Sequence, residues 1–169
     1  MSGVTSMKKS ISDSISTYRQ QLAAGDIRVA YEFLLKYVMA LKASFEKECA
    51  DKYSTGNVSP GYMDFTYFPF FDAYLRENKL RFGIVLNHEK IRFELWLMGQ
   101  NAEVQKEYWN LLKTSKWNKN QVTMPKYSVL ESVLVEAPNF EDIDALTAKI
   151  ISRADSLASE ITQHLKNQI

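Results

Sequence analysis

The sequence predicts an α+β protein with the element order ααβββαβα, in which helices pack on a mostly antiparallel sheet. Apolar residues recur every three or four positions near both ends of the chain, as in amphipathic helices. Two segments in the middle alternate apolar and polar residues and are separated by a short turn, which is typical of a β-hairpin. With 46% hydrophobic and 12% aromatic residues, the 169-residue chain can form a substantial core. We expect a flexible arm over residues 1–9 and a single domain over residues 10–169.

Four segments are predicted to be helices, and the residues that bound them support this. The first helix follows Ser10 and ends at Gly25, and the second, longer helix begins at Asp26. The third follows Asn101, and the last follows Asp142 and reaches the end of the chain. Short polar side chains accept hydrogen bonds from the free backbone N–H groups of a first turn, and glycine is a common helix stop.

Four segments are predicted to be strands. They cover residues 62–68, 79–86, 91–98 and 128–136. Pro69 and Pro138 should end the first and last strands, because proline lacks the N–H group that a ladder needs. Residues 70–78 are expected to hold one helical turn. The second and third strands form the hairpin.

Composition excludes several classes of protein. The 21 basic and 20 acidic residues give a formal charge of +1, so nucleic acid is disfavoured as a partner. Cys49, His88 and His164 are too few for a zinc finger, an iron–sulfur cluster or a disulfide framework, and we expect no cofactor. No segment has the roughly 18 to 20 consecutive apolar residues that span a bilayer, and residues 1–9 lack a signal-peptide core. A cytoplasmic location is expected.

A candidate ligand-binding surface follows from strand alternation. Arg81 shares a strand face with Gly83 and Val85, and the next strand places Arg92, Glu94 and Trp96 together. The first strand should add Asp64 and Thr66 to the same surface. Aromatic rings beside arginines bind planar or anionic ligands. The predicted ligand-binding residues are Asp64, Arg81, Arg92, Glu94 and Trp96.

The sequence also allows a plainer interpretation of these residues. Arginine and carboxylate pairs often decorate the solvated face of an antiparallel sheet without binding anything. His88, in the hairpin turn, is either a solvated turn residue or an acid–base group. A basic run in residues 113–126 with Trp117 and Tyr127 interleaved is either a solvated loop, which we favour, or a weak nucleic-acid contact.

Two segments carry a family resemblance. Gly-Tyr-Met-Asp-Phe-Thr-Tyr-Phe over residues 61–68 and Arg-Phe-Glu-Leu-Trp-Leu-Met-Gly over residues 92–99 resemble hallmark segments of a family of uncharacterised bacterial proteins. The likeness covers most of the chain. It implies a bacterial cytoplasmic protein and directs attention to Asp64, Arg92, Glu94 and Trp96.

A second resemblance is topological. From the second predicted helix onward the order αβββαβ is similar to the core of restriction-endonuclease-like domains. That family binds a divalent metal through an acid on the second strand and a Glu-x-Lys or Asp-x-Lys on the third. Here Trp96 replaces the lysine after Glu94, and residues 79–86 contain no acid. The resemblance therefore implies a degenerate or variant nuclease centre.

The sequence thus favours a non-enzymatic binding module for a small ligand or a protein, with the nuclease-like domain as the alternative. The expected ligand is small and anionic or planar. A homodimer, formed through the last helix or an exposed sheet edge, is a further possibility.

Overall fold

A computed structural model describes residues 8–168. The elements, in chain order, are α1 (Ile11–Ala24), α2 (Asp26–Glu48), β1 (Ser54–Thr55), β2 (Phe65–Phe71), α3 (Ala73–Glu77), β3 (Leu80–Asn87), β4 (Arg92–Gly99), α4 (Ala102–Leu112), β5 (Leu130–Val135) and α5 (Ile143–Asn167). The predicted α+β class and its element order are confirmed. The structure adds the two-residue strand β1 and shows the expected helical turn as α3.

The chain divides after Tyr37 into two units. The first contains α1 and the beginning of α2. The Ser10 hydroxyl caps α1 by accepting a hydrogen bond from the Asp13 N–H at 3.1 Å, as predicted. Gly25 ends α1 with a φ of +94°, a conformation that favours glycine. No residue of α1 is buried. Residues 1–7 of the predicted arm lie outside the described residues, and the prediction of one domain over 10–169 stays a prediction.

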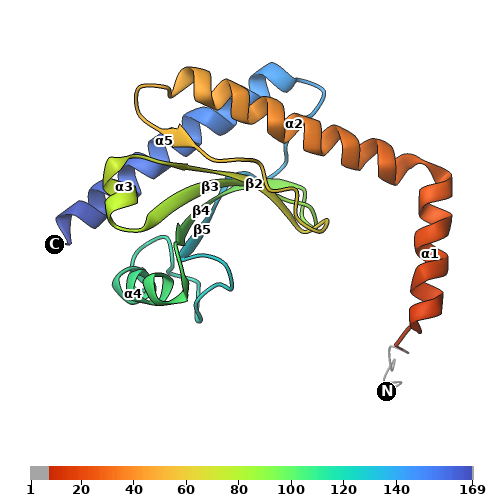
Figure 1. Ribbon diagram of the computed structural model, residues 1–169, viewed down its shortest axis with the longest axis horizontal. Coiled ribbons are helices and arrows are strands. Elements are labelled where there is room, and N and C mark those ends of the chain that lie inside the picture. Colours follow the sequence, from red (N-terminus) through yellow and green to blue (C-terminus); the bar gives the residue numbers. More distant parts are fainter. Residues whose placement is uncertain (1–7, 169) are drawn as a thin grey trace. The chain divides into compact units, whose positions relative to one another are not determined.

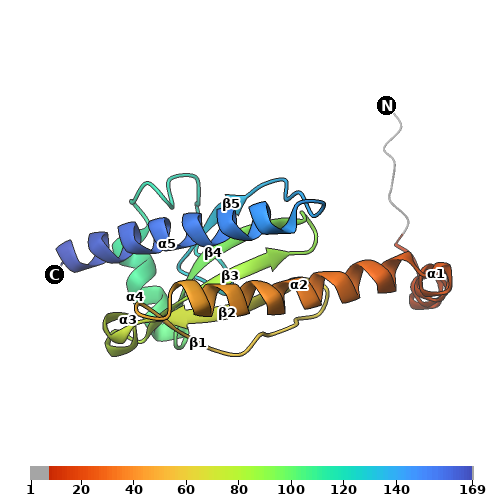
Figure 2. The ribbon, with the colours of Figure 1, turned by 90° about the horizontal axis from the view of Figure 1, so that it is seen from above.

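The second unit, from Val38 onward, is built on a five-stranded sheet. Its strands follow one another in the order β1-β2-β3-β4-β5, and every neighbouring pair is antiparallel. α5 and the part of α2 in this unit lie over the same face of the sheet (Figures 1 and 2). We call this the covered face and the opposite one the distal face.

The covered face is lined by large apolar side chains. The fully buried ring of Phe45 on α2 lies 5.7 Å from Phe68 and 4.7 Å from Phe70, centroid to centroid. Phe70 in turn stacks on Phe82 of β3. Further core positions of β3 and β4 on this face are Ile84, Leu86, Phe93, Leu95 and Leu97, each at most 1% exposed. The main core therefore lies between this face and the two helices.

The prediction that Pro69 ends the first strand is wrong. β2 begins at Phe65 and continues through Pro69 to Phe71. Tyr67, two residues earlier, exchanges both backbone hydrogen bonds with Ser59 rather than with β3. Pro69 has the same orientation, so its missing N–H falls on the edge side, where its carbonyl accepts from Gly56. Proline is therefore tolerated inside β2.

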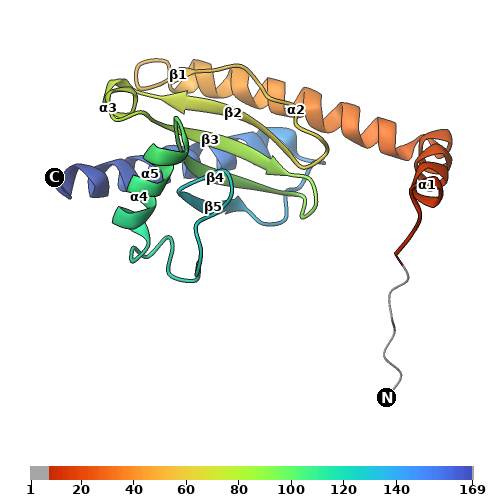
Figure 3. The same cartoon turned by 60° about the horizontal axis from the view of Figure 1, so that its bottom comes forward.

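Within the second unit, α4 covers one end of the distal face. It crosses the end of β4, where the Gly99 backbone lies too close to Gln105 for any side chain. Figure 3 shows this helix at one end of the sheet, with no other helix of the second unit over the rest of β2 and β3 on this side. The Asn101 side chain caps α4 by accepting from the Val104 N–H at 2.9 Å, as predicted.

The apolar side of α5 is used within the chain. Asp142 caps this helix as predicted, accepting from the Ala145 N–H at 3.2 Å. Ile150, Ala154 and Ile161 are fully buried. A homodimer would therefore need another surface, such as the edge at β5, and it stays a prediction. No helix within residues 8–168 is both long and apolar enough to span a membrane.

Substitution of Phe45 by alanine should lower the free energy of unfolding by about 3–5 kcal/mol, because it removes the ring that joins α2 to β2. Met39→Ala on the same helix, at a side chain that is 55% exposed, should cost less than about 1 kcal/mol. Urea unfolding of both variants measures the difference. Equal losses would contradict this view of the core.

Candidate functional site

The register of β3 and β4 brings the predicted polar residues onto the distal face. Gly83 pairs with Trp96, and Val85 pairs with Glu94, so Arg81 and Arg92 share this face with them. The alternation predicted for these two strands is therefore confirmed.

Thr66 does not belong to this surface. It pairs with Leu86, which places it on the covered face, whereas its neighbour Tyr67 pairs with Val85 and takes the distal position. Thr66 is fully buried, and its hydroxyl donates to the Pro60 carbonyl at 2.7 Å. The prediction failed because it extended the alternation of β2 back to Asp64, and a strand displaced by one residue turns every side chain to the other face.

Asp64 holds the loop that precedes β2. Its Oδ1 accepts hydrogen bonds from the backbone N–H groups of Tyr62 at 2.8 Å and Phe65 at 2.7 Å. These two donors lower the pKa of the Asp64 carboxyl group below its usual value. The neighbouring Gly61 has a φ of +72°, which suits the tight bend. Asp64 thus shapes the rim of the distal face.

A buried carboxylate organises the distal face. Glu94 is 1% exposed, and its Oε2 accepts from Arg92 Nε at 2.8 Å and from Asn87 Nδ2 at 3.0 Å. Its Oε1 accepts from the indole N–H of Trp96 at 2.9 Å. The pKa of Arg92 is raised chiefly by its own hydrogen bond to Glu94. The carboxylate is satisfied on both oxygens, as a buried charge must be.

Glu131, on β5 opposite Trp96, is a second carboxyl group at this side of the sheet. Partial desolvation raises its pKa, the hydrogen bond from the Ser128 hydroxyl lowers it, and the nearby Glu94 carboxylate raises it.

An aromatic cavity of about 280 Å³ lies beside this network. The edge of Phe65 meets the Trp96 ring at a centroid distance of 4.7 Å, and Tyr127 lies 6.5 Å from Phe65. The full lining is Ser59, Gly61, Tyr62, Asp64, Phe65, Tyr67, Arg81, Trp96, Met98 and Tyr127.

Gly83 lies beneath two side chains that line the cavity, Met98 and Tyr67. A Cβ at this position would lie 2.7 Å from the end of Met98 and 3.4 Å from the Tyr67 ring. A side chain at position 83 would therefore require the end of Met98 to move.

Three of the five predicted ligand-binding residues line this cavity, namely Asp64, Arg81 and Trp96. Arg92 and Glu94 do not line it, and they act on it through the Trp96 indole. The sequence prediction did not include Tyr67, Met98 or Tyr127. Tyr67 would follow from the correct register of β2, and Met98 follows from the alternation of β4 that places Trp96 on this face. Tyr127 comes from the loop before β5, where strand alternation gives no information.

Two residues of the basic run over residues 113–126 contact the helix α5. Lys116 pairs with Glu160 of α5, and the Trp117 ring meets His164 edge to face at a centroid distance of 5.1 Å. Trp117 is therefore packed against α5, which supports the preferred interpretation of this run as a loop.

His88 is more enclosed than a solvated turn residue. Its Nε2 lies 2.7 Å from the Thr66 hydroxyl, and its backbone N–H donates to the Asp64 carbonyl. Burial lowers the pKa of the His88 imidazole, and the Asp64 carboxylate partly offsets this. Since the Thr66 hydroxyl already donates to Pro60, Nε2 is the donor to Thr66. His88 thus ties the hairpin turn to the loop at the cavity rim.

The described residues offer little for metal chemistry. Within residues 8–168 there is no group of three or more His, Cys, Asp or Glu side chains able to hold a metal ion. The Cys49 thiol is buried, and burial raises its pKa.

Fold and site together define an α+β protein whose antiparallel sheet carries helices on one face and an aromatic cavity with an arginine at its rim on the other. A family model described as "Domain of unknown function (DUF7000)" matches residues 11–165. The chain belongs to this family. No curated protein and no solved structure matches it.

Replacement of Glu94 by glutamine should lower the free energy of unfolding by about 3 kcal/mol, because the Arg92 guanidinium loses its buried counterion and the amide can no longer accept on both atoms. Glu131→Gln is the matched control, since Glu131 lies opposite Trp96 on the neighbouring strand and is exposed. It should cost less than about 1 kcal/mol. Urea unfolding at neutral pH compares the two, and similar losses would show that the Glu94 network is not structural.

Lowering the pH from 7.5 to 5.5 should destabilise the wild type more than His88→Gln. The pKa of His88 is lowered in the folded state, so the unfolded chain binds more protons as the pH falls through about 6.5 and the folded state loses stability. The two proteins are identical at every other position, so the comparison isolates residue 88. Unfolding midpoints at the two pH values measure the effect, and parallel changes would exclude His88 as its source.

Proposed function

We propose that this chain is a non-enzymatic binding module whose distal cavity holds a small planar ligand. The observation that carries the proposal is the cavity itself, a hollow open to solvent that is lined by Trp96, Phe65 and Tyr127, with Arg81 at its rim. We further propose, from the sequence resemblance and from cysteine usage, that the module works in a bacterial cytoplasm.

The shape and chemistry of the cavity favour a flat, ring-shaped ligand. Aromatic side chains attract a planar ring through edge-to-face and stacked contacts, and they expose few polar groups to it. Small-molecule sites are commonly apolar cavities with a few polar groups that orient the ligand. Here Trp96 is held in place by Glu94, so one wall exists before any ligand arrives.

Charge at the rim supports an anionic substituent on that ligand. Arg81 is exposed and lines the cavity, while Asp64 opposite already accepts two backbone hydrogen bonds. The arginine is therefore the group that a ligand charge would meet, and its guanidinium binds carboxylates and phosphates well.

The nuclease-like alternative would require Glu94 to ligate a metal ion. Its carboxylate is 1% exposed and accepts three hydrogen bonds from protein donors. Loss of those donors would be needed before a hard cation could bind. The binding-module proposal needs no such rearrangement.

The chain has three tryptophans, so Trp109→Phe combined with Trp117→Phe leaves Trp96 as the only one. Titration of planar aromatic compounds into this variant should change Trp96 fluorescence and raise the melting temperature. In the same background Tyr127→Ala should weaken binding by about tenfold, since it removes one aromatic wall.

Tyr18→Ala is the matched control, because Tyr18 is also an exposed tyrosine and lies on α1. It should leave the affinity unchanged. The proposal fails if no planar compound alters Trp96 emission, or if Tyr18→Ala and Tyr127→Ala weaken binding equally. A protein-binding surface, the competing class, predicts the first of these results.

A further inference from the structure

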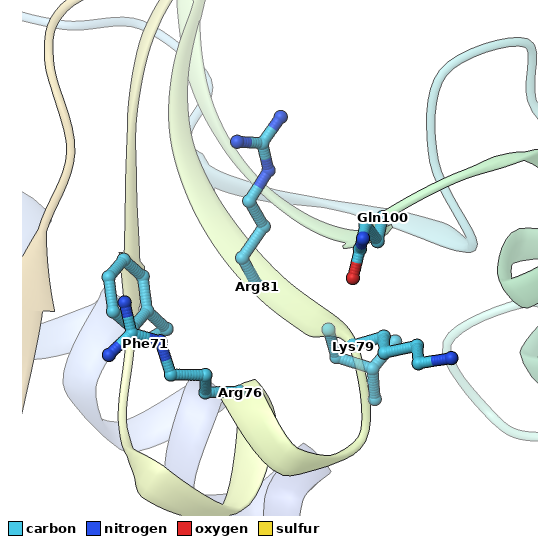
Figure 4. A pocket seen from close by; sticks show the side chains of 6 residues that line it. Phe71, Arg76, Lys79, Arg81 and Gln100 are labelled. Carbon is cyan, nitrogen blue, oxygen red and sulfur yellow. The ribbon is translucent and has the colours of Figure 1, made fainter.

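A second cavity, of about 270 Å³, lies next to the aromatic one and has a different character. It is lined by Phe71, Arg76, Lys79, Leu80, Arg81 and Gln100, so three of its six lining residues are cationic and none is acidic. Figure 4 shows Arg76 beside Phe71 on one side, Gln100 on the other and Arg81 between them. We call this the basic cavity.

The backbone fixes the origin of each cationic side chain. Arg76 lies in the last turn of the short helix α3, and its guanidinium carbon lies 5.2 Å from the centre of the Phe71 ring. Lys79 adopts a φ of +59°, which is uncommon for a residue with a side chain. Its N–H donates to the Arg76 carbonyl at 3.1 Å, and its carbonyl accepts from Gln100 at 2.9 Å. These bonds hold the turn that brings positions 76, 79 and 81 to one cavity.

The three cations lack acidic partners. None of the six ion pairs within the described part of the chain includes Arg76, Lys79 or Arg81. Figure 4 shows the charged groups of Arg76, Lys79 and Arg81 apart from one another. All three side chains are exposed, so each can turn toward a bound anion. Like charges repel, so a bound anion would relieve the repulsion among these three side chains.

Arg81 lines both the basic cavity and the aromatic cavity. We propose that the basic cavity is the oxyanion subsite of the same ligand, and that the ligand is a heteroaromatic ring joined to a phosphate-sized oxyanion. This inference rests on the proposed function, because the ring must occupy the aromatic cavity. Two arginines supply the planar donor pairs that match phosphate oxygens, and the amide of Gln100 supplies a neutral donor.

The experiment compares ligands that differ only in the oxyanion. The four ribonucleosides and riboflavin are each titrated, alongside their 5′-monophosphates, into the protein that retains only Trp96. At least one monophosphate should bind tenfold or more tightly than its nucleoside or riboflavin counterpart. The double variant Arg76→Gln/Lys79→Gln should remove most of that difference while the affinity for the uncharged compound changes less than twofold. The difference should also shrink as sodium chloride is raised, since exposed charges are screened.

The control is Arg28→Gln/Lys106→Gln, which removes one arginine and one lysine, both exposed, that line neither cavity. This control variant should keep the full difference in affinity between each monophosphate and its uncharged counterpart. Melting temperatures confirm that both double variants fold.

The outcomes separate the two proposals. If an uncharged compound binds and its monophosphate binds no tighter, or if the difference survives in Arg76→Gln/Lys79→Gln, the oxyanion subsite is wrong and the aromatic cavity stands. If neither member of any pair binds, both proposals are wrong. If inorganic phosphate binds but no ring compound does, the proposal that one ligand joins a ring to an oxyanion is wrong.

Discussion

The distal face depends on one buried charge. A carboxylate that is 1% exposed must receive hydrogen bonds from its neighbours, and Glu94 receives them from Asn87, Arg92 and Trp96. Asn87 and Arg92 are paired residues at the closed end of the β3–β4 hairpin, so the network requires the observed register of that hairpin. Its third donor fixes the Trp96 indole, which is a wall of the aromatic cavity.

The main core and the candidate binding site lie on opposite faces of the sheet. The rings of Phe45, Phe68 and Phe70 lie on the covered face, where α2 and α5 exclude water. On the distal face the buried residues Val85, Trp96 and Met98 form a smaller cluster with Phe65 and Tyr67 packed against it. Because the main core lies on the other side of the sheet, side chains around the distal cavity can serve a ligand without forming part of that core.

The alternation of apolar and polar residues predicts the correct sheet face for the residues of β3 and β4, but not for those of β2. In the hairpin each strand has eight residues with an alternating pattern, and the turn between the strands is short. The pattern and the turn length therefore favour the same pairing register. In β2 nearly every residue is apolar or aromatic, and the pattern contains no clear polar face. The pattern therefore puts Thr66 on the wrong face, and it predicts a strand end at Pro69, whose missing N–H in fact falls on the edge side of β2 and breaks no bond to β3.

Other parts of the candidate site depend on features that periodicity does not encode. Tyr127 reaches the aromatic cavity from a loop, and Lys79 reaches the basic cavity through a left-handed backbone conformation held by hydrogen bonds to Arg76 and Gln100.

Arg81 connects the two cavities, and its position explains why a long cationic side chain stands on an otherwise apolar strand. Its strand partner is Met98, and the adjacent Gly83 leaves room for Met98 to lie low over β3. The aliphatic part of an arginine can cover such a surface while its guanidinium stays in water. Arg81 therefore lines both cavities with one side chain. A single ligand that spans both would contact it from both sides, whereas two unrelated ligands would compete for the same side chain.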